Sequence, residues 1–88
     1  MSMSQPTTSE SDFFLTSDLG LATTLSLYFT LEDIDHSDPR KALFVFKQQP
    51  KLNQILVSYF NNDPTLTIRP QVFFNQLRDV KARLYAER

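Results

Sequence analysis

The chain has 88 residues with no cysteine, one glycine and one histidine, and its formal net charge is −1 at pH 7. A chain of this length is expected to form one small domain that buries roughly 60% of its unfolded surface, which leaves little room for an enclosed active site. The lack of cysteine excludes disulfides, thiolate zinc sites and a thiol nucleophile, whereas eight Phe and three Tyr within a hydrophobic content of 41% predict a packed core.

The amino-terminal segment, residues 1–11, is rich in Ser and Thr and has no large apolar residue other than two methionines. It is predicted to be a disordered tail before a single domain at residues 12–88. It lacks the basic flank and apolar run of a signal peptide, and no apolar run in the chain reaches the roughly 18 residues of a membrane span. We therefore expect a cytoplasmic protein without membrane contact.

The domain is expected to begin with a short apolar run, Phe13–Leu15, followed by a helix. Three residues with side-chain oxygens precede this helix as N-cap candidates: Thr16, Ser17 and Asp18. Four apolar residues then recur at helical spacing: Leu21, Ala22, Leu25 and Phe29. Gly20 weakens the helix by up to about 1 kcal/mol relative to Ala, and its missing side chain allows a neighbouring segment to approach closely.

A β-hairpin is predicted from two strands at residues 30–37 and 41–48. In the second strand apolar residues occupy both faces, with Phe44 and Phe46 on one face and Leu43 and Val45 on the other. We therefore expect this strand to be covered on both sides.

The loop expected in this hairpin, residues 36–41, lies beside a cluster of potential metal ligands: Asp33, Asp35, His36 and Asp38. An EF-hand calcium loop requires glycine at its sixth position and glutamate at its twelfth, whereas counting from Asp33 these positions hold Asp38 and Phe44. The single histidine has no cysteine or second histidine to complete a transition-metal site. The cluster is predicted to be a solvated loop, and neither a metal ion nor another cofactor is expected.

Two further helices are predicted in the second half of the chain. Residues 49–63 have Pro50 in the first turn and a buried stripe of Leu52, Ile55, Leu56, Tyr59 and Phe60. Residues 65–68 are either a short third strand or an extended crossing. Residues 69–88 form the strongest helix, held on the sheet by a stripe of Phe73, Leu77, Val80 and Leu84. The predicted fold is an α+β domain in the order helix, β-hairpin, helix, short extended segment and long carboxy-terminal helix.

A flank of the last helix offers the main candidate for binding. Phe74, Arg78, Lys81 and Tyr85 are spaced to form one strip beside the apolar stripe. Interleaved basic and aromatic groups contact phosphates, bases or aromatic side chains. In the alternative interpretation, the two aromatic residues belong to the edge of the core and the two basic residues lay their aliphatic stems over it.

Three segments carry a family resemblance: TSDLGLATTL at residues 16–25, FVF at residues 44–46 and RPQVFFNQLRDVKARLY at residues 69–85. Together they resemble a family of small bacterial, plasmid and phage proteins known only as a domain of unknown function. The resemblance extends over most of the domain. It implies a compact α+β fold and a mobile-element setting, and it supplies no catalytic residue.

Acidic and basic residues are divided unevenly along the chain, which bears on the kind of partner that the protein binds. Residues 1–38 carry seven carboxylates and no Lys or Arg, whereas residues 39–88 carry all nine basic residues and three carboxylates. Either the two halves pack together, or the protein meets a charged partner. With one glycine, the chain has no phosphate-binding loop, dinucleotide fingerprint or nucleophile elbow, so catalytic residues are not expected.

We therefore expect a non-enzymatic module that binds another protein, because mixed charge and many aromatic residues suit protein interfaces. Two alternatives stay open. The basic half binds nucleic acid, or the acidic half imitates phosphates and inhibits a host nucleic-acid enzyme. A homodimer is compatible with all three.

Overall fold

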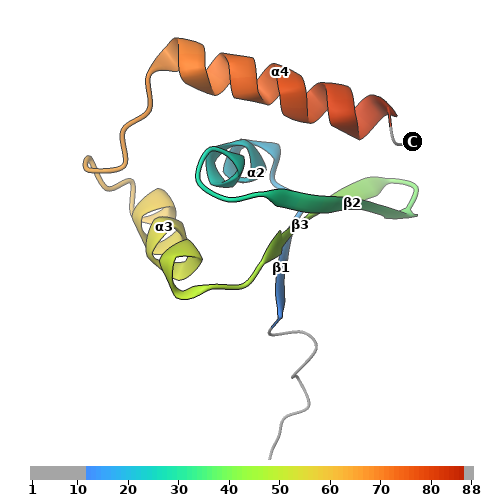
Figure 1. Ribbon diagram of the computed structural model, residues 1–88, viewed down its shortest axis with the longest axis horizontal. Helices are drawn as coiled ribbons and strands as arrows, with labels where there is room; N and C mark the ends of the chain where they lie inside the picture. The colour runs from blue at the N-terminus through green and yellow to red at the C-terminus, as the bar shows by residue number, and fades with distance from the viewer. Residues whose placement is uncertain (1–11, 87–88) are drawn as a thin grey trace, which may run out of the picture.

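The structure, a computed structural model, describes residues 12–86. The predicted tail at residues 1–11 lies outside the described residues. The elements are, in chain order, β1 (Phe13–Thr16), α2 (Leu19–Ser26), β2 (Leu31–Asp38), β3 (Lys41–Lys47), α3 (Pro50–Phe60) and α4 (Pro70–Ala86) (Figure 1). The predicted α+β class is confirmed.

The sheet has three antiparallel strands in the order β1-β3-β2. The predicted hairpin is confirmed as β2 and β3. The loop predicted at residues 36–41 is present but shorter, because β2 continues to Asp38 and β3 begins at Lys41. A carboxylate oxygen of Asp38 accepts a hydrogen bond of 2.9 Å from the backbone N–H of Arg40 and closes a tight turn between the strands.

The third strand is β1, which the sequence had indicated only as an apolar run. Phe14 lies opposite Phe46 and Leu15 lies opposite Val45, so β1 pairs with β3, the second strand of the hairpin. Residues 65–68, the other candidate for a third strand, form a turn and a segment without regular secondary structure instead.

Helix α2 is the centre of the core. Asp18 is its N-cap, and a carboxylate oxygen accepts a hydrogen bond of 3.1 Å from the backbone N–H of Leu21. Every residue from Leu21 to Leu25 is buried, because α2 contacts α4, α3, β1 and β2 on its different sides. Phe29 lies beyond the end of the helix but still packs against the core.

Helix α3 covers one side of α2. Leu52 is buried, and Ile55, Leu56 and Tyr59 pack against the core as predicted. Phe60 was wrongly assigned to this stripe, since its side chain is 68% exposed. The predicted close approach at Gly20 is confirmed, because a β-carbon added there would lie 3.1 Å from the hydroxyl oxygen of Tyr59.

Helix α4 lies across α2, as Figure 1 shows with α2 beneath it and seen nearly end-on. The expectation that it packs chiefly on the sheet is wrong for this reason. Val80 is its buried residue, and the other members of the predicted stripe, Phe73, Leu77 and Leu84, are half-buried.

The face of the sheet that carries Leu43 and Val45 is only partly covered. Both residues are half-buried, and Phe13 and Leu15 on the neighbouring strand are 44% exposed. The prediction that β3 is covered on both sides is therefore wrong. In the part of the chain that the structure describes, no helix combines the length and apolar character needed to cross a membrane.

Candidate interaction surface

The rotation of α4 about its axis is fixed by three contacts on its inner side. Val80 is 3% exposed and belongs to the core cluster. The amide Nε2 of Gln76 donates a hydrogen bond of 2.9 Å to Oγ of Ser26 on α2. Further along, Nη1 of Arg83 donates a bond of 2.6 Å to the backbone carbonyl of Leu31 on β2. The opposite side of α4 must therefore face solvent.

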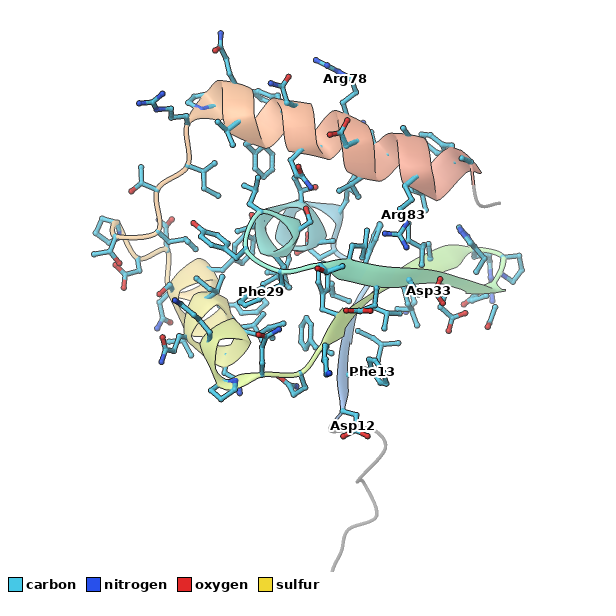
Figure 2. All side chains as sticks on the ribbon, viewed as in Figure 1. Asp12, Phe13, Phe29, Asp33, Arg78 and Arg83 are labelled. Atoms are coloured by element: carbon cyan, nitrogen blue, oxygen red, sulfur yellow. The ribbon has the colours of Figure 1, made fainter. Side chains whose placement is uncertain are left out.

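Four side chains occupy that outer side, which we call the outer strip: Phe74, Arg78, Lys81 and Tyr85. All four are exposed, with exposed fractions of 60% for Phe74 and 56% for Tyr85. Figure 2 shows Arg78 pointing away from the body of the protein. These exposures favour an available surface over the edge of the core. The binding role of the strip stays a prediction.

A hollow of about 640 Å³ lies at the Phe74 end of the strip, between the end of α3, the following loop and the start of α4. Its apolar wall consists of Leu66, Ile68, Pro70, Phe73 and Phe74. The rings of Phe73 and Phe74 meet edge to face, with centroids 5.8 Å apart. Both rings line the hollow.

One carboxylate lies among these apolar groups. Asp63 accepts hydrogen bonds from the backbone N–H of Thr65 at 2.9 Å and from its hydroxyl at 2.8 Å. These bonds hold the pKa of Asp63 below its usual value, with the backbone bond as the larger cause. Asp63 is therefore ionised at neutral pH and makes this end of the surface locally acidic.

A second hollow, of about 470 Å³, lies at the Tyr85 end of the strip. Its wall comes from α4 and from the turn of the hairpin, and includes His36, Arg40, Lys41, Leu84 and Tyr85. The Nε2 atom of His36 is buried and has no hydrogen-bond partner. The wall also includes Asp38, so the cations Arg40 and Lys41 lie there beside one carboxylate, whereas the hollow at the Phe74 end has Asp63 as its charged residue.

Arg83 does not belong to this surface although it is one of the basic residues of the last helix. Its Nη1 and Nη2 atoms donate to the backbone carbonyls of Leu31 and Glu32. Figure 2 shows this side chain directed from α4 toward β2. Two cations, Arg78 and Lys81, are thus left between the two aromatic residues of the outer strip.

The acidic cluster is part of strand β2 and not of a loop. Asp33 accepts from the backbone N–H of Ile34 at 2.8 Å, and Asp35 accepts from the backbone and the hydroxyl of Ser37. The bonds from Ser37, the side-chain bond first, lower the pKa of Asp35. Within residues 12–86, no three His, Cys, Asp or Glu side chains are grouped so as to hold a metal ion.

The sequence indicated the outer strip through its helical spacing but neither of the hollows. The hollow at the Phe74 end joins the start of α4 to Thr24 of α2 and to the end of α3, and the hollow at the Tyr85 end joins α4 to the hairpin turn. No local pattern encodes such a meeting. The inward direction of Arg83 was missed for the same reason.

The fold and the surface together define a small α+β domain that presents aromatic and basic side chains along one helix. The chain matches the family described as "Domain of unknown function (DUF5659)" over residues 11–86 and belongs to that family. No curated protein and no solved structure matches it.

Proposed function

We propose that the protein is a non-enzymatic interaction module that binds a partner protein through the outer strip. The observation that carries this proposal is the exposure of Phe74 and Tyr85 on a helix whose inner side is fixed. Aromatic and Arg side chains supply much of the energy of protein interfaces. A helix held in one orientation presents them with little loss of conformational entropy on binding.

The side chains of the outer strip indicate which partner groups would complement them. An apolar partner side chain fits beside Phe74, where the hollow is lined by Ile68 and Phe73. Partner carboxylates fit opposite Arg78 and Lys81. We therefore expect a partner surface with an apolar residue and neighbouring acidic residues.

Nucleic-acid binding is the alternative that the same strip must be tested against. By sequence, residues 69–88 carry five basic and two acidic side chains. That excess corresponds to ~3 neutralised phosphates and a slope of log affinity against log salt near −3. With Arg83 bound to β2 carbonyls, the two outward cations correspond to a slope nearer −2 and to weaker binding.

Two further parts of the proposal rest on the sequence. The family resemblance supports a phage or plasmid setting, and the lack of cysteine is compatible with a reducing cytoplasm. The third alternative, an inhibitor that imitates phosphates, would use the carboxylates of β2 instead of the outer strip.

Affinity capture with three immobilised forms of the protein tests the proposal: wild type, the double variant Phe74→Ala/Tyr85→Ala, and Phe60→Ala. Phe60 is an exposed aromatic residue on α3 and is the matched control. A protein that wild type and control retain and the double variant loses supports the proposal. Each single aromatic substitution should then weaken binding by more than ~1 kcal/mol, and Arg78→Ala should act mainly on the association rate.

Two results would contradict the proposal. One is sub-micromolar binding of unrelated duplex DNA at physiological salt, abolished by Arg78→Ala with Lys81→Ala, which would promote the nucleic-acid alternative. The other is a partner that the double variant retains but that is lost when Asp33 and Asp35 are changed to Asn. That result would promote the inhibitor.

A further inference from the structure

The two edges of the sheet differ in how they are protected from pairing with another strand. The β2 edge is acidic, and its register with β3 is irregular between Leu31 and Asp33 and again between Asp35 and Asp38. Arg83 also donates to two of its carbonyls. Charge, bulges and a covering side chain are the means by which proteins keep an edge strand from pairing.

The β1 strand has neither the charges nor the bulges of β2. Residues Phe13 to Thr16 include no charge and no proline, and their register with β3 is regular. Among the described residues, no strand pairs with the other side of β1. Figure 2 shows Phe13 on β1, toward the end of the sheet far from α4.

The register identifies the backbone groups on the open side of β1. The N–H of Gln48 donates to the carbonyl of Asp12 at 2.9 Å, which continues the register of Phe14 with Phe46. Residues of an antiparallel pair alternate between bonding to the partner strand and pointing away from it. Phe13 and Leu15 therefore direct their N–H and C=O groups to the open side.

We propose that β1 pairs antiparallel with β1 of a second copy of this chain, about a two-fold axis at Phe14. Phe13 then lies opposite Leu15 of the second copy, and Leu15 opposite Phe13. The open backbone groups of these two residues find partners on both chains. The two three-stranded sheets become one continuous sheet.

The side chains favour a second copy as the occupant. Phe13 and Leu15, each 44% exposed, become cross-strand neighbours on the open face of the sheet, and an aromatic residue beside an aliphatic one stabilises a strand pair. Phe14 lies opposite Phe14 of the second copy, on the other face of the sheet. Asp12 lies opposite Thr16, so no two carboxylates face one another.

The neighbouring register is less suitable. An axis at Leu15 would place Phe13 opposite Ser17, which lies outside β1 and immediately before the N-cap Asp18. Pairing there would compete with the start of α2. The open edge of β1 is also separate from the outer strip on α4. The proposed dimer can therefore be tested independently of the proposed function.

Sedimentation equilibrium of the purified full chain, at increasing concentrations up to about 1 mM, tests the association. A concentration-dependent dimer is expected. Leu15→Lys should raise its dissociation constant at least ~tenfold, because a charge on an edge strand opposes pairing. Val57→Lys, which places the same charge at an exposed position on α3, should leave the constant unchanged. A monomer throughout this range, or equal effects of the two variants, would overturn the proposal.

Disulfide trapping tests the register itself, since the chain has no cysteine of its own. A mixture of Phe13→Cys and Leu15→Cys proteins should form disulfide-linked dimers on mild oxidation, because these positions face one another at a Cα separation of about 5.5 Å. Either protein alone should form few, since its two cysteines would be about 9 Å apart, beyond disulfide reach. Equal yields in the mixture and in the separate proteins would contradict the register.

Discussion

Helices α2 and α4 differ in length and in how many of their residues are buried. Helix α2 has eight residues, of which five in succession are buried, whereas α4 has 17 residues, of which Val80 alone is buried. The buried stretch of α2 includes Thr23 and Thr24, whose hydroxyls donate to the carbonyls of Leu19 and Gly20 at 2.8 and 3.0 Å. The short helix is therefore an internal part of the core, and the long one is a surface element.

This difference separates stability from binding within one small domain. Substitutions in α2 should lower the free energy of unfolding, because each buried side chain there has neighbours on several sides. Substitutions on the outer strip of α4 should leave that free energy almost unchanged and should affect binding alone. Four measurements test this difference between the two helices.

The largest effect is expected for Leu25→Ala in α2. Leu25 is fully buried, so its truncation removes apolar contacts and leaves a cavity that costs ~2–5 kcal/mol of unfolding free energy. Urea denaturation followed by circular dichroism measures this loss, with Arg78→Ala on α4 as the control. A loss below ~1 kcal/mol at Leu25 would contradict the central position of α2.

A smaller loss is expected on the inner side of α4. Val80→Ala removes two buried carbon atoms and should cost ~2 kcal/mol by the same measurement. Leu77, which the sequence had grouped with Val80, is half-buried. Leu77→Ala should therefore cost less than Val80→Ala despite the larger truncation. The reverse order would mean that α4 packs through a different side.

A third effect concerns the bond between α4 and β2. Arg83→Ala leaves the carbonyls of Leu31 and Glu32 without their charged donor and should cost ~1–2 kcal/mol. Lys81→Ala, two residues away on the outer strip, should change stability by less than ~0.5 kcal/mol. Thermal unfolding of the two variants makes the comparison. Equal effects would show that Arg83 adds nothing to the attachment of α4.

The smallest effect is expected for the ionisation of Tyr59, which lies on α3 with its hydroxyl beside Gly20 of α2. Burial, and secondly the charge of Asp18, raise the pKa of Tyr59 above its ordinary 10.0. Because the folded protein holds this proton more tightly than the unfolded chain, the associated stability is present below pH 10 and is lost as the pH rises through the folded pKa. An ultraviolet titration of wild type against Tyr59→Phe isolates this ionisation.

Asp18→Asn provides the control for that titration. Asn is also a good N-cap, so α2 should persist, and the pKa of Tyr59 should fall only in part because burial is the larger cause. A complete return to the ordinary value would mean that Tyr59 is not buried against α2.

Features with a local cause were predictable from the sequence. Asp18 caps α2 because its carboxylate reaches the free N–H groups of the first turn. Helical spacing placed Phe74 and Tyr85 on one strip, but it left open whether they were exposed or at the edge of the core. A close approach at Gly20 was predictable, since the missing side chain leaves space there. The sequence did not identify Tyr59 as the residue that approaches.

Features with a distant cause were not predictable. Residues Phe13–Thr16 are too few to show an alternating pattern, and they become a strand only because β3 lies beside them. Thr23 and Thr24 are polar residues that α2 buries, since α4 and α3 cover the sides on which a surface helix would meet water. Which cation of α4 turned inward depended on how that helix was rotated.

Helix α4 is attached along one side only, which affects how its amide hydrogens exchange with water. Its one fully buried side chain, Val80, and the bonds from Gln76 and Arg83 all lie on the inner side, whereas α2 is enclosed by α4, α3, β1 and β2. Amides at the ends of α4 should therefore exchange through smaller openings than the amides of α2. A partner that contacts both ends of α4 would slow exchange there more than in α2.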